Sequence, residues 1–446
     1  MLRRFFHKIR FYQHIMTAFW QKRKRLVIFS FLLGVGAFFL IYRLFNLSQI
    51  KVEKIGVVGK FTLDELPIEI QKLISDGLTE VAPDGSAKPA LAAHWEVQNE
   101  GKEYLFTLKD NLFWQDDKPI AATDINLNFS DVASTIIDQK TIKFQLKEPF
   151  SPFPIAVSRP LFKKGFIGTG SYQVQSLKRN GQIIEKLVLV PTKDKKQPKK
   201  IFHFYPTEET ARIGFKLGEV NLLQEIVRPE DLSGWGKVEI TPEVKKNRFV
   251  AIFFNTNDPQ LGSKSNRQAL AYAIKKNWEE RALNSFNPDS WAYNESVKPY
   301  DYDLENAKKL LETENGEGEK EILKEIELST FSSLLPVAEQ IKKDWEELGM
   351  TTQIKVVNVP TDDYQALLAT QEIPSDPDQY LFWHSTQTTN IVHYKSPKLD
   401  KLLEDGRKEL DQEKRKTLYA DFQKFLVEET PAVFLYYPTV YNLSKK

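Results

Sequence analysis

The sequence predicts an α/β protein of two lobes with a β-rich side subdomain, preceded by one apolar helix. The chain has 446 residues, more than a single hydrophobic core usually serves, so two lobes are expected. Hydrophobic residues make up 41% and charged residues 27%, which is ordinary for a folded protein. Strand-like and helix-like segments alternate after residue 200, whereas strand-like segments dominate before it, a pattern that favours α/β lobes with a separate β-rich part.

The N-terminal part combines a basic tail, 1–25, with an uncharged apolar stretch at 26–42. Taken as 26–47, this segment is long enough to cross a bilayer core of about 30 Å. Four consecutive basic residues at 22–25 place the tail in the cytoplasm and the main body outside. We therefore predict a single-pass signal anchor in the cytoplasmic membrane. A cleaved signal peptide is the alternative, although no small-x-small cleavage site follows the apolar stretch.

The β-rich first part is expected to contain strands at 51–60, 95–97, 104–108, 141–146 and 183–190, with a helix at 68–78. The following part is expected to alternate strands at 201–205, 220–224, 249–255, 354–359 and 432–437 with helices at 208–217, 267–276, 304–311, 335–348, 362–369, 398–409 and 413–428.

The domain boundaries follow from this alternation. We assign 51–250 to lobe I with the β-rich subdomain and 251–425 to lobe II. Residues 426–446 are assigned to a C-terminal return to lobe I, which then includes the strand near 432–437. The chain is expected to cross between the lobes near 249–255 and again near 428–432.

Charge and cysteine content exclude several classes of protein. The formal net charge is +2, and because nine Lys or Arg lie before residue 44, the remainder carries −7. A mildly acidic body does not fit nucleic acid as a partner, since binding a phosphate backbone needs a basic surface. The chain has no Cys, which excludes disulfides, zinc–thiolate sites, thiol nucleophiles and a lipid-modified N-terminal cysteine.

A series of segments carries a resemblance to a known family. Residues 73–95 (LISDGLTEVAPDGSAKPALAAHW) combine a helix and a Pro-Asp-Gly turn with a Pro-Ala-Leu-Ala sequence and a Trp. Further matches follow in order at 104–125, 147–153, 168–172, 218–223, 254–256, 267–274, 335–349, 376–378 and 394–437. Together they resemble family 5 of the extracellular solute-binding proteins, which includes the oligopeptide- and dipeptide-binding components of ABC importers. The resemblance spans residues 51–442.

The resemblance implies a two-lobed, periplasmic-binding-protein-like (type II) fold that closes on its ligand about a hinge. It also implies an extracytoplasmic protein that captures an oligopeptide or another small extended ligand and delivers it to ABC transporter permease subunits in the cytoplasmic membrane. We expect a monomer. A receptor ectodomain that senses its ligand and signals through a membrane partner is the alternative function.

Two departures from the family pattern concern the subdomain and the ligand. The segment between Ile125 and Thr141 is short for the family, so the β-rich subdomain is expected to be reduced. Peptide-binding members resemble one another in placing an Asp just upstream of the Asp-Pro-Asp segment, where it pairs with the amino terminus of a peptide. Residues 371–375 (QEIPS) lack that Asp. Glu372 is the candidate substitute, and a ligand without a free amine is the alternative.

Eight residues are candidates for ligand contact: Asn255, Thr256, Glu372, Asp376, Asp378, Tyr380, Trp383 and His384. The first two end a buried strand, which is the usual location of ligand-facing polar groups in α/β folds. The aromatic segment 380–383 offers contact area that tolerates different ligand side chains, with core packing as the alternative.

Structural roles are expected for three charged residues, Asp376, Asp378 and Arg267, and for the two Asp residues a chemical role is the alternative. Asp376 and Asp378 could form an acid/base pair or a calcium site. Pro377 between them favours a turn that leads into a helix. Arg267 is expected to form a structural ion pair.

The sequence contains no pattern typical of catalysis or metal binding. None of the six His residues lies in an HExxH motif. Residues 168–171 (GTGS) fit neither the Walker motif nor Gly-x-Ser-x-Gly. We therefore predict a protein that is not an enzyme and that needs no cofactor or metal, with an extracellular hydrolase as the alternative.

Overall fold

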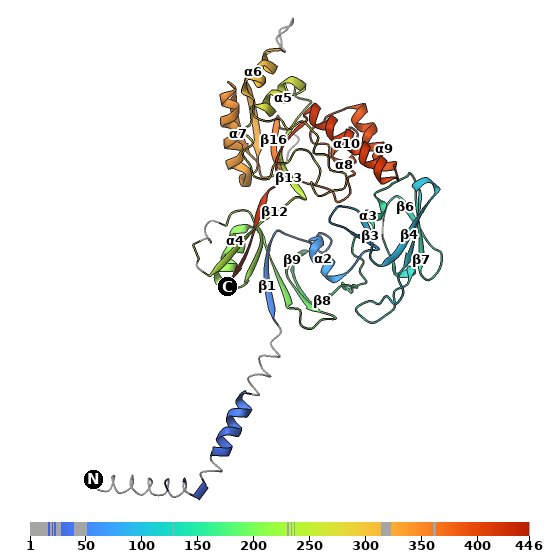
Figure 1. Cartoon of the computed structure of the whole chain (residues 1–446), viewed down its shortest axis with the longest axis vertical. Helices are drawn as coiled ribbons and strands as arrows, with labels where there is room; N and C mark the ends of the chain where they lie inside the picture. Colours follow the sequence, from blue (N-terminus) through green and yellow to red (C-terminus); the bar gives the residue numbers. More distant parts are fainter. Residues whose placement is uncertain are drawn as a thin grey trace, which may run out of the picture. The chain divides into compact units, whose positions relative to one another are not determined.

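The computed structural model describes residues 51–445 apart from 128, 230, 231, 233, 236, 314–322 and 360–362, together with residues 17, 20, 22, 23 and 28–39 (Figure 1). The chain forms two units. One consists of Met1–Val52 with Asp194–Lys199, and the other of Glu53–Lys193 with Lys200–Lys446. The second unit is called the body below.

In the first unit, residues 28–39 are helical and nearly all of their side chains are exposed. The large apolar ones range from 47% exposed for Ile28 to 70% for Phe31. Within the residues that the structure describes, no helix has the length and apolar character needed to cross a membrane. The predicted span at 26–47 is therefore not confirmed. Most of the tail 1–25 and both ends of the predicted span lie outside the described residues.

Seven strands form the sheet of the first lobe, in the order β12-β18-β11-β1-β10-β9-β8. Strands β1 and β11 are parallel, and β18 is antiparallel to both β11 and β12. Two helices bury apolar side chains against strand residues, with Ile70 and Ile74 from the first helix and Phe215 from the second. The strands are β1 (Val52–Val58), β8 (Tyr172–Asn180), β9 (Ile183–Pro191), β10 (Lys199–Tyr205), β11 (Leu222–Ile226), β12 (Val238–Val244) and β18 (Thr439–Lys445), and the helices are α2 (Ile68–Ile74) and α4 (Glu208–Leu217).

A four-stranded sheet in the order β4-β5-β7-β6 forms the β-rich side subdomain of the first lobe. Alternate residues of β5 and β7 are buried, as expected of strands that cover a core with one face. The core is aromatic and includes Phe106, Phe144 and Phe153. The elements are β4 (Ala92–Gln98), β5 (Glu103–Leu108), β6 (Val132–Ile136), β7 (Thr141–Leu146) and α3 (Phe153–Ala156), and a separate pair, β2 (Thr79–Val81) and β3 (Ala87–Pro89), lies nearby in sequence.

The second lobe contains a five-stranded sheet in the order β15-β14-β16-β13-β17. Its strand β13 has six consecutive buried residues, FVAIFF, because helices cover both faces of the sheet (Figure 1). The strands are β13 (Arg248–Phe254), β14 (Glu325–Thr330), β15 (Thr351–Val356), β16 (Ala366–Glu372) and β17 (Ala432–Tyr436). The helices are α5 (Lys264–Tyr272), α6 (Leu304–Thr313), α7 (Leu335–Glu347), α8 (Tyr380–Trp383), α9 (Pro397–Lys408) and α10 (Gln412–Glu429).

The predicted two-lobed α/β architecture is present, but two details of the prediction are wrong. The strand near 432–437 was assigned to lobe I, whereas β17 pairs with β13 in the second lobe and only β18 returns to the first. The predicted helix at 362–369 is replaced by β16 over its described residues from Ala366 on. A short apolar run such as ALLA fits a buried strand as well as a helix, so hydrophobic pattern alone does not separate the two.

Candidate functional site

Two neighbouring connections join the lobes. The chain passes from β12 in the first sheet to β13 in the second, and it returns from β17 to β18. The two passages lie side by side, because the backbone N–H of Lys245 donates to the carbonyl of Pro438 at 2.9 Å. Pairing continues on both sides, from Val244 with Thr439 in one sheet to Val250 with Tyr436 in the other. Two adjacent extended connections are the structural form of a hinge between lobes.

Ion pairs gather at this hinge. Lys245 Nζ lies 2.9 Å from Glu225 Oε1 and 2.6 Å from Glu243 Oε1, and Arg248 also pairs with Glu225. Burial opposes ionisation of Glu225, but the hydrogen bonds from Lys245 and Arg248 prevail and hold its pKa below the usual range. Since Glu225 lies in the first-lobe strand β11 and Arg248 begins the second-lobe strand β13, these contacts tie the two lobes together at the hinge.

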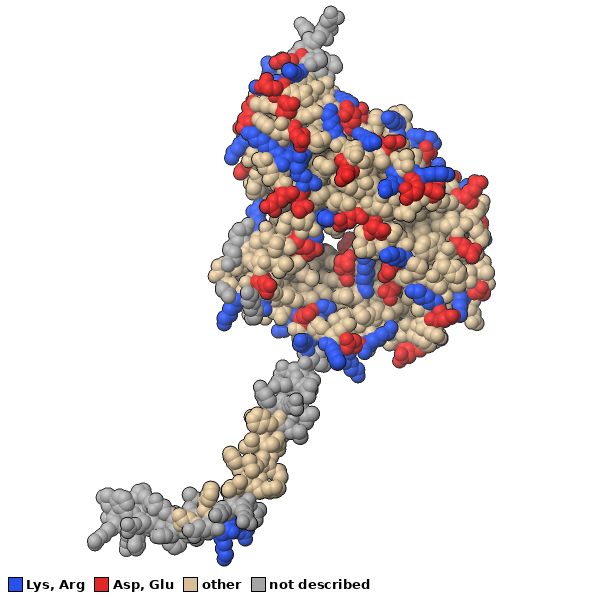
Figure 2. Space-filling model, viewed as in Figure 1, with Lys and Arg blue, Asp and Glu red and all other residues tan. Residues whose placement is uncertain are grey.

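The body has an opening beside the hinge. Figure 2 shows it where Figure 1 places the crossing strands β12 and β13, above β1 and α2, with side chains of both charges at its rim. Away from the hinge, the side subdomain touches the second lobe. The N–H of Trp291 donates to the carbonyl of Asp84 at 3.0 Å, and the N–H of Ser151 donates to the carbonyl of Arg407 at 2.9 Å.

Asp376 is buried in a bidentate ion pair. Arg415 on α10 donates to both of its carboxylate oxygens, through Nη1 to Oδ2 at 3.0 Å and through Nη2 to Oδ1. Burial raises the pKa of the Asp376 carboxyl and the Arg415 guanidinium opposes that shift. The pair lines a cavity of about 250 Å³ between the side subdomain and the second lobe, together with Trp95, Tyr104 and Trp291. With both oxygens engaged, Asp376 is not available as a free acid.

Asp378, Tyr380 and His384 form a second paired group, around Arg407 on α9. Arg407 donates to Asp378 Oδ2 from Nε at 3.1 Å and from Nη2 at 2.7 Å, and its guanidinium lies 4.0 Å from the Tyr380 ring centroid. Tyr380 stacks on His384 at 4.1 Å. The Arg407 guanidinium also lies 5.2 Å from the ring centroid of Phe150 in the side subdomain. These predicted ligand residues therefore support a contact between the lobes.

Of the other predicted ligand residues, Asn255 and Thr256 form hydrogen bonds within the second lobe, whereas Glu372 has an exposed side chain. Asn255 Nδ2 donates to the carbonyl of Tyr364 at 3.0 Å, and Thr256 Oγ1 donates to the carbonyl of Val392 at 2.9 Å. Both polar side chains hold loops of the second lobe. Glu372 ends β16 with an exposed side chain, opposite Arg248 in the strand pair. Glu372 therefore remains the candidate amine partner among the predicted residues.

Trp383 packs in the core of the second lobe. Its ring is 3% exposed and lies 6.5 Å from that of Phe253 and 6.2 Å from that of Phe434. Its indole N–H donates to Gln379 Oε1 at 2.9 Å. The alternative of core packing thus describes this residue better than exposure to a ligand.

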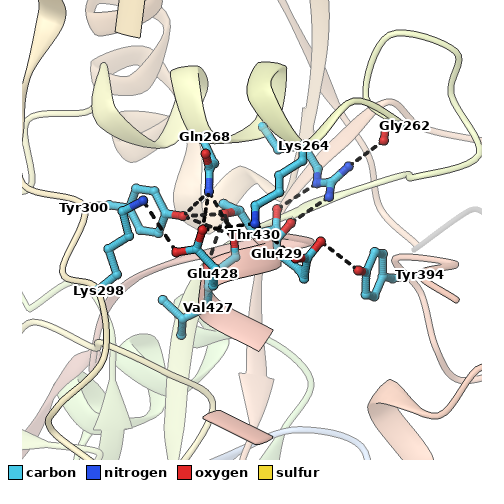
Figure 3. A network of polar contacts seen from close by, with 11 residues as sticks. Gly262, Lys264, Gln268, Lys298, Tyr300, Tyr394, Val427, Glu428, Glu429 and Thr430 are labelled. Carbon is cyan, nitrogen blue, oxygen red and sulfur yellow. Dashed lines mark hydrogen bonds and ion pairs between the residues drawn. The ribbon is translucent and has the colours of Figure 1, made fainter. Parts of the chain in front are cut away.

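Arg267 is structural, but through carbonyl groups. It donates to the backbone carbonyls of Leu261, Gly262, Glu429 and Thr430 at 2.6 to 3.1 Å. Figure 3 shows the surrounding network at the end of α10, where Gln268 donates to Tyr300, Tyr300 contacts Thr430, and Lys264 and Tyr394 donate to Glu429. Thr430 has φ 52°, so this network fixes the left-handed turn from α10 into β17.

The first lobe contains a larger pocket, of about 410 Å³. Residues from the loop after β1, from α2, from positions 126, 127 and 129 and from the segment 159–166 line it. Its apolar wall includes Phe129, Phe162 and Phe166, and its charged lining groups are Asp64, Arg159 and Lys163. None of these residues belongs to the predicted site, because no motif or buried strand in the sequence marks them.

This pocket lies at the edge of the first sheet from which the chain crosses to the second lobe. Strand β18 begins there at Thr439, and β11 runs antiparallel to it, so the carboxyl end of β11 lies at the same edge. Because β1 is parallel to β11, its carboxyl end lies there too, and the pocket residues Leu63 and Asp64 follow that end by five and six residues. Ligands of α/β proteins bind at the carboxyl ends of parallel strands.

Among the described residues, no group of three or more His, Asp or Glu side chains is placed to hold a metal ion. The charged groups described above are engaged with one another or line open pockets. Their arrangement is suited to binding between lobes that move about a hinge. The cavity near Asp376 and the first-lobe pocket differ in whether their charged side chains already have partners within the protein.

Comparison of the sequence with known proteins matches most of the chain to one family. Residues 86–391 match the family described as bacterial extracellular solute-binding proteins, family 5. The dipeptide-binding protein of Escherichia coli is 23% identical over 455 residues, which cover 83% of each chain.

Solved structures with the same fold hold different ligands. NikZ from Campylobacter jejuni, in complex with Ni(L-His), is similar with a TM-score of 0.72 and 23% identity, over 89% of this chain and 94% of that one. AppA from Bacillus subtilis, in complex with a nonapeptide, is similar with a TM-score of 0.68 and 19% identity, over 89% and 95% of the two chains.

Proposed function

Because the chain belongs to family 5 of the bacterial extracellular solute-binding proteins, we propose that it captures an oligopeptide or another small extended ligand for an ABC importer. The ligand would bind between the two lobes and be handed to the permease subunits. The observation that carries this proposal is the hinge, in which two adjacent connections join the lobes beside an opening. Ligand bound between the lobes would favour a closed arrangement.

The ligand class rests on two considerations. Relatives named for dipeptides and a solved relative that holds a nonapeptide favour a peptide. The relative that holds Ni(L-His) makes a small metal chelate the alternative.

We further propose that the apolar helix anchors the protein in the cytoplasmic membrane, with the body outside and the basic tail inside. The exposed Phe and Leu side chains of residues 28–39 support an apolar environment around this helix. Anchoring would keep the binding protein near its permease and raise its effective concentration there. Replacing Leu32 and Leu33 by Asp should move the protein from the membrane fraction to the soluble fraction, whereas Ser30→Ala should leave it in place.

Lobe closure can be tested with spin labels, because the chain has no native Cys. Labels at Lys178→Cys in β8 and Lys342→Cys in α7 report the distance between the lobes. A matched pair at Lys342→Cys and Lys401→Cys lies within the second lobe. Addition of a peptide digest to the full-length chain in detergent should shorten the first distance and leave the second unchanged.

The outcomes separate the possibilities. An unchanged distance between the lobes, in a sample that a ligand stabilises in thermal melts, would contradict closure. Ligand at 100 times its Kd should add about 2.7 kcal/mol to the free energy of unfolding. If neither peptides nor nickel–histidine stabilise the chain, the proposed capture function is wrong.

A further inference from the structure

We propose that one end of the first-lobe sheet is a docking surface for a membrane, and that its partner is a layer of anionic lipid headgroups. This end, at which strands β1, β10 and β11 begin, is called the basal end below. The inference rests on the proposed anchoring of the chain, and it names the surface of the first lobe that would face the lipid.

The strand directions define the basal end. Strands β1 and β11 are parallel, and the N–H of Gly59, just after β1, donates to the carbonyl of Tyr205 at the end of β10. The three strands therefore begin at the same end of the sheet. Strand β9 is antiparallel to β10 and β18 is antiparallel to β11, so both end there. The hinge lies at the opposite end, where β12 ends and β18 begins.

The segment that leads to the proposed anchor joins the sheet at the basal end. Strand β1 begins at Val52, and the eleven residues 40–50 separate the described helical residues 28–39 from Lys51. A chain of that length spans at most about 40 Å. A membrane that holds the helix is therefore always within that distance of the basal end.

A lysine-rich loop lies at the basal end. Residues 192–200 (TKDKKQPKK), which join β9 to β10, contain five Lys and one Asp. The N–H of Lys199 donates to the carbonyl of Lys51 at 2.8 Å, so the loop lies beside the segment that leads to the anchor. Lys195 and Lys196 are exposed, and within the described part of the chain neither forms an ion pair. Their ammonium groups are therefore available to anions.

The basal end is basic although the chain beyond the N-terminal region is acidic. The segments next to the strand ends there contain ten Lys and four Asp or Glu, a net charge of +6, whereas residues 44–446 together carry −7. Positive charge gathered at one end of an acidic protein favours a surface that meets anionic headgroups. The segments counted are 51–54, 192–200, 216–221, 235–239 and 444–445.

Two exposed apolar side chains lie at the same end. Leu217, the last residue of α4, is 73% exposed, and Trp235, three residues before β12, is 43% exposed. The Nζ of Lys216 lies 5.9 Å from the Trp235 ring centroid, so the end of α4 and the segment before β12 are neighbours. Trp is favoured at the boundary between lipid and water, and exposed apolar groups among Lys are typical of surfaces that bind lipid.

Docking at the basal end would hold the first lobe at the membrane and leave the second lobe to move. The lobes are joined at the opposite end of this sheet, so closure about the hinge would move the second lobe relative to the lipid. The permease would then always meet the first lobe in the same orientation.

The test measures energy transfer from a label on the full-length chain to headgroup-labelled lipid. The chain would be reconstituted into vesicles of phosphatidylcholine, alone or with about one third phosphatidylglycerol. Because the chain has no Cys, an impermeant reagent can label Ser171→Cys or Gln182→Cys alone. These exposed residues lie just beyond the two ends of β8, the first at the basal end and the second at the opposite end.

We expect about twofold higher transfer from the Ser171→Cys label in anionic than in neutral vesicles, and no increase from Gln182→Cys. About 1 M NaCl, at which the Debye length is about 3 Å, should abolish the difference.

Variants of the basal end should reduce this difference. Lys195→Gln/Lys196→Gln should lower it by about half or more, because the loop loses its exposed charges. Leu217→Ser/Trp235→Ser should lower it as well. The matched control is Lys60→Gln/Arg179→Gln, which removes two exposed positive charges at the opposite end of the same sheet and should leave the difference unchanged.

Equal transfer from Ser171→Cys in the two kinds of vesicle would overturn the proposal, and so would an anionic effect that Lys195→Gln/Lys196→Gln leaves intact. Flotation of the same samples tests the anchoring separately. Co-flotation with neutral vesicles supports the anchor, even where the transfer contradicts docking. Flotation with anionic vesicles alone, reversed by salt, would support docking and contradict the anchor. A chain that floats with neither would contradict both.

Discussion

The loop after β16 and the first-lobe pocket after β1 differ in whether their charged side chains have partners within the protein. In the loop, Asp376 and Asp378 are each held by an arginine through two hydrogen bonds. In the pocket, Asp64 and Arg159 have no such partners among the described residues. The loop is the more conspicuous of the two in the sequence, with its Asp-Pro-Asp and aromatic residues. The conspicuous residues here are engaged in the scaffold, whereas the inconspicuous pocket residues are exposed.

Burial explains this difference. A carboxylate that leaves water must be paired and hydrogen-bonded, so the buried Asp376 needs Arg415. An exposed group needs no internal partner, because water solvates it until a ligand arrives. Four predictions test whether burial sets the energetic cost of altering these charged groups.

The largest expected effect is that of Arg415→Met. It would leave Asp376 buried without a counter-charge and lower the free energy of unfolding by about 3–5 kcal/mol. Urea denaturation measures the change. The double variant Asp376→Leu/Arg415→Met should recover most of the loss, because no buried charge is left unpaired.

A matched control is Arg407→Met, which breaks the other pair of the same loop. Both carboxylates are 10% exposed, but Arg407 is 25% exposed against 7% for Arg415, so removing Arg407 opens its partner to water more readily than removing Arg415 does. We expect a smaller loss, of about 1–2 kcal/mol. Equal losses for the two variants would show that burial does not set the cost of breaking these pairs.

An intermediate effect is expected from Lys276, a buried cation that donates to backbone carbonyls of Ala271 and Tyr300, each at 2.6 Å. Burial lowers its pKa to about 7, an effect to which Arg281 adds and which Asp301 and Asp344 oppose. Above that pH the folded chain loses a proton that the unfolded chain keeps until about pH 10. Stability should therefore rise with pH from 7 upward, by at most about 1.4 kcal/mol per pH unit.

Lys276→Met should remove this part of the pH dependence. Thermal or urea unfolding of both proteins at pH 7, 8 and 9 would measure the difference in their free energies of unfolding. Stability of the variant relative to the wild type should fall as pH rises. A constant difference across this range would mean that Lys276 stays charged in the folded chain, held by its carbonyl partners.

The smallest expected effect on stability comes from the pocket. Asp64→Asn and Arg159→Gln should each change the free energy of unfolding by less than about 0.5 kcal/mol in the absence of ligand, because neither side chain has a partner to lose among the described residues. The same melts used for Arg415→Met would show this. A loss above about 1 kcal/mol would make these groups structural and would remove the contrast with the loop.

The sequence predicted the elements with strong local patterns. The apolar run FVAIFF became the buried strand β13, and the segment predicted as a helix at 413–428 became α10. It failed where local pattern is ambiguous, as at 362–369, where β16 forms instead of a helix. The position of β17 could not be read from its composition, because a buried apolar strand fits the edge of either sheet.

By itself, the sequence determined the α/β class, the two lobes and the family, because hydrophobic periodicity and ordered motifs are properties of the chain. Tertiary structure alone decided which charged groups find partners. Arg407 and Arg415 reach Asp378 and Asp376 only because α9 and α10 fold back on the loop after β16. Asp64 and Arg159, 95 positions apart, share one pocket only because the sheet brings their loops together. Whether two charged side chains pair depends on the distance between them in the folded protein. That distance cannot be read from their separation along the sequence.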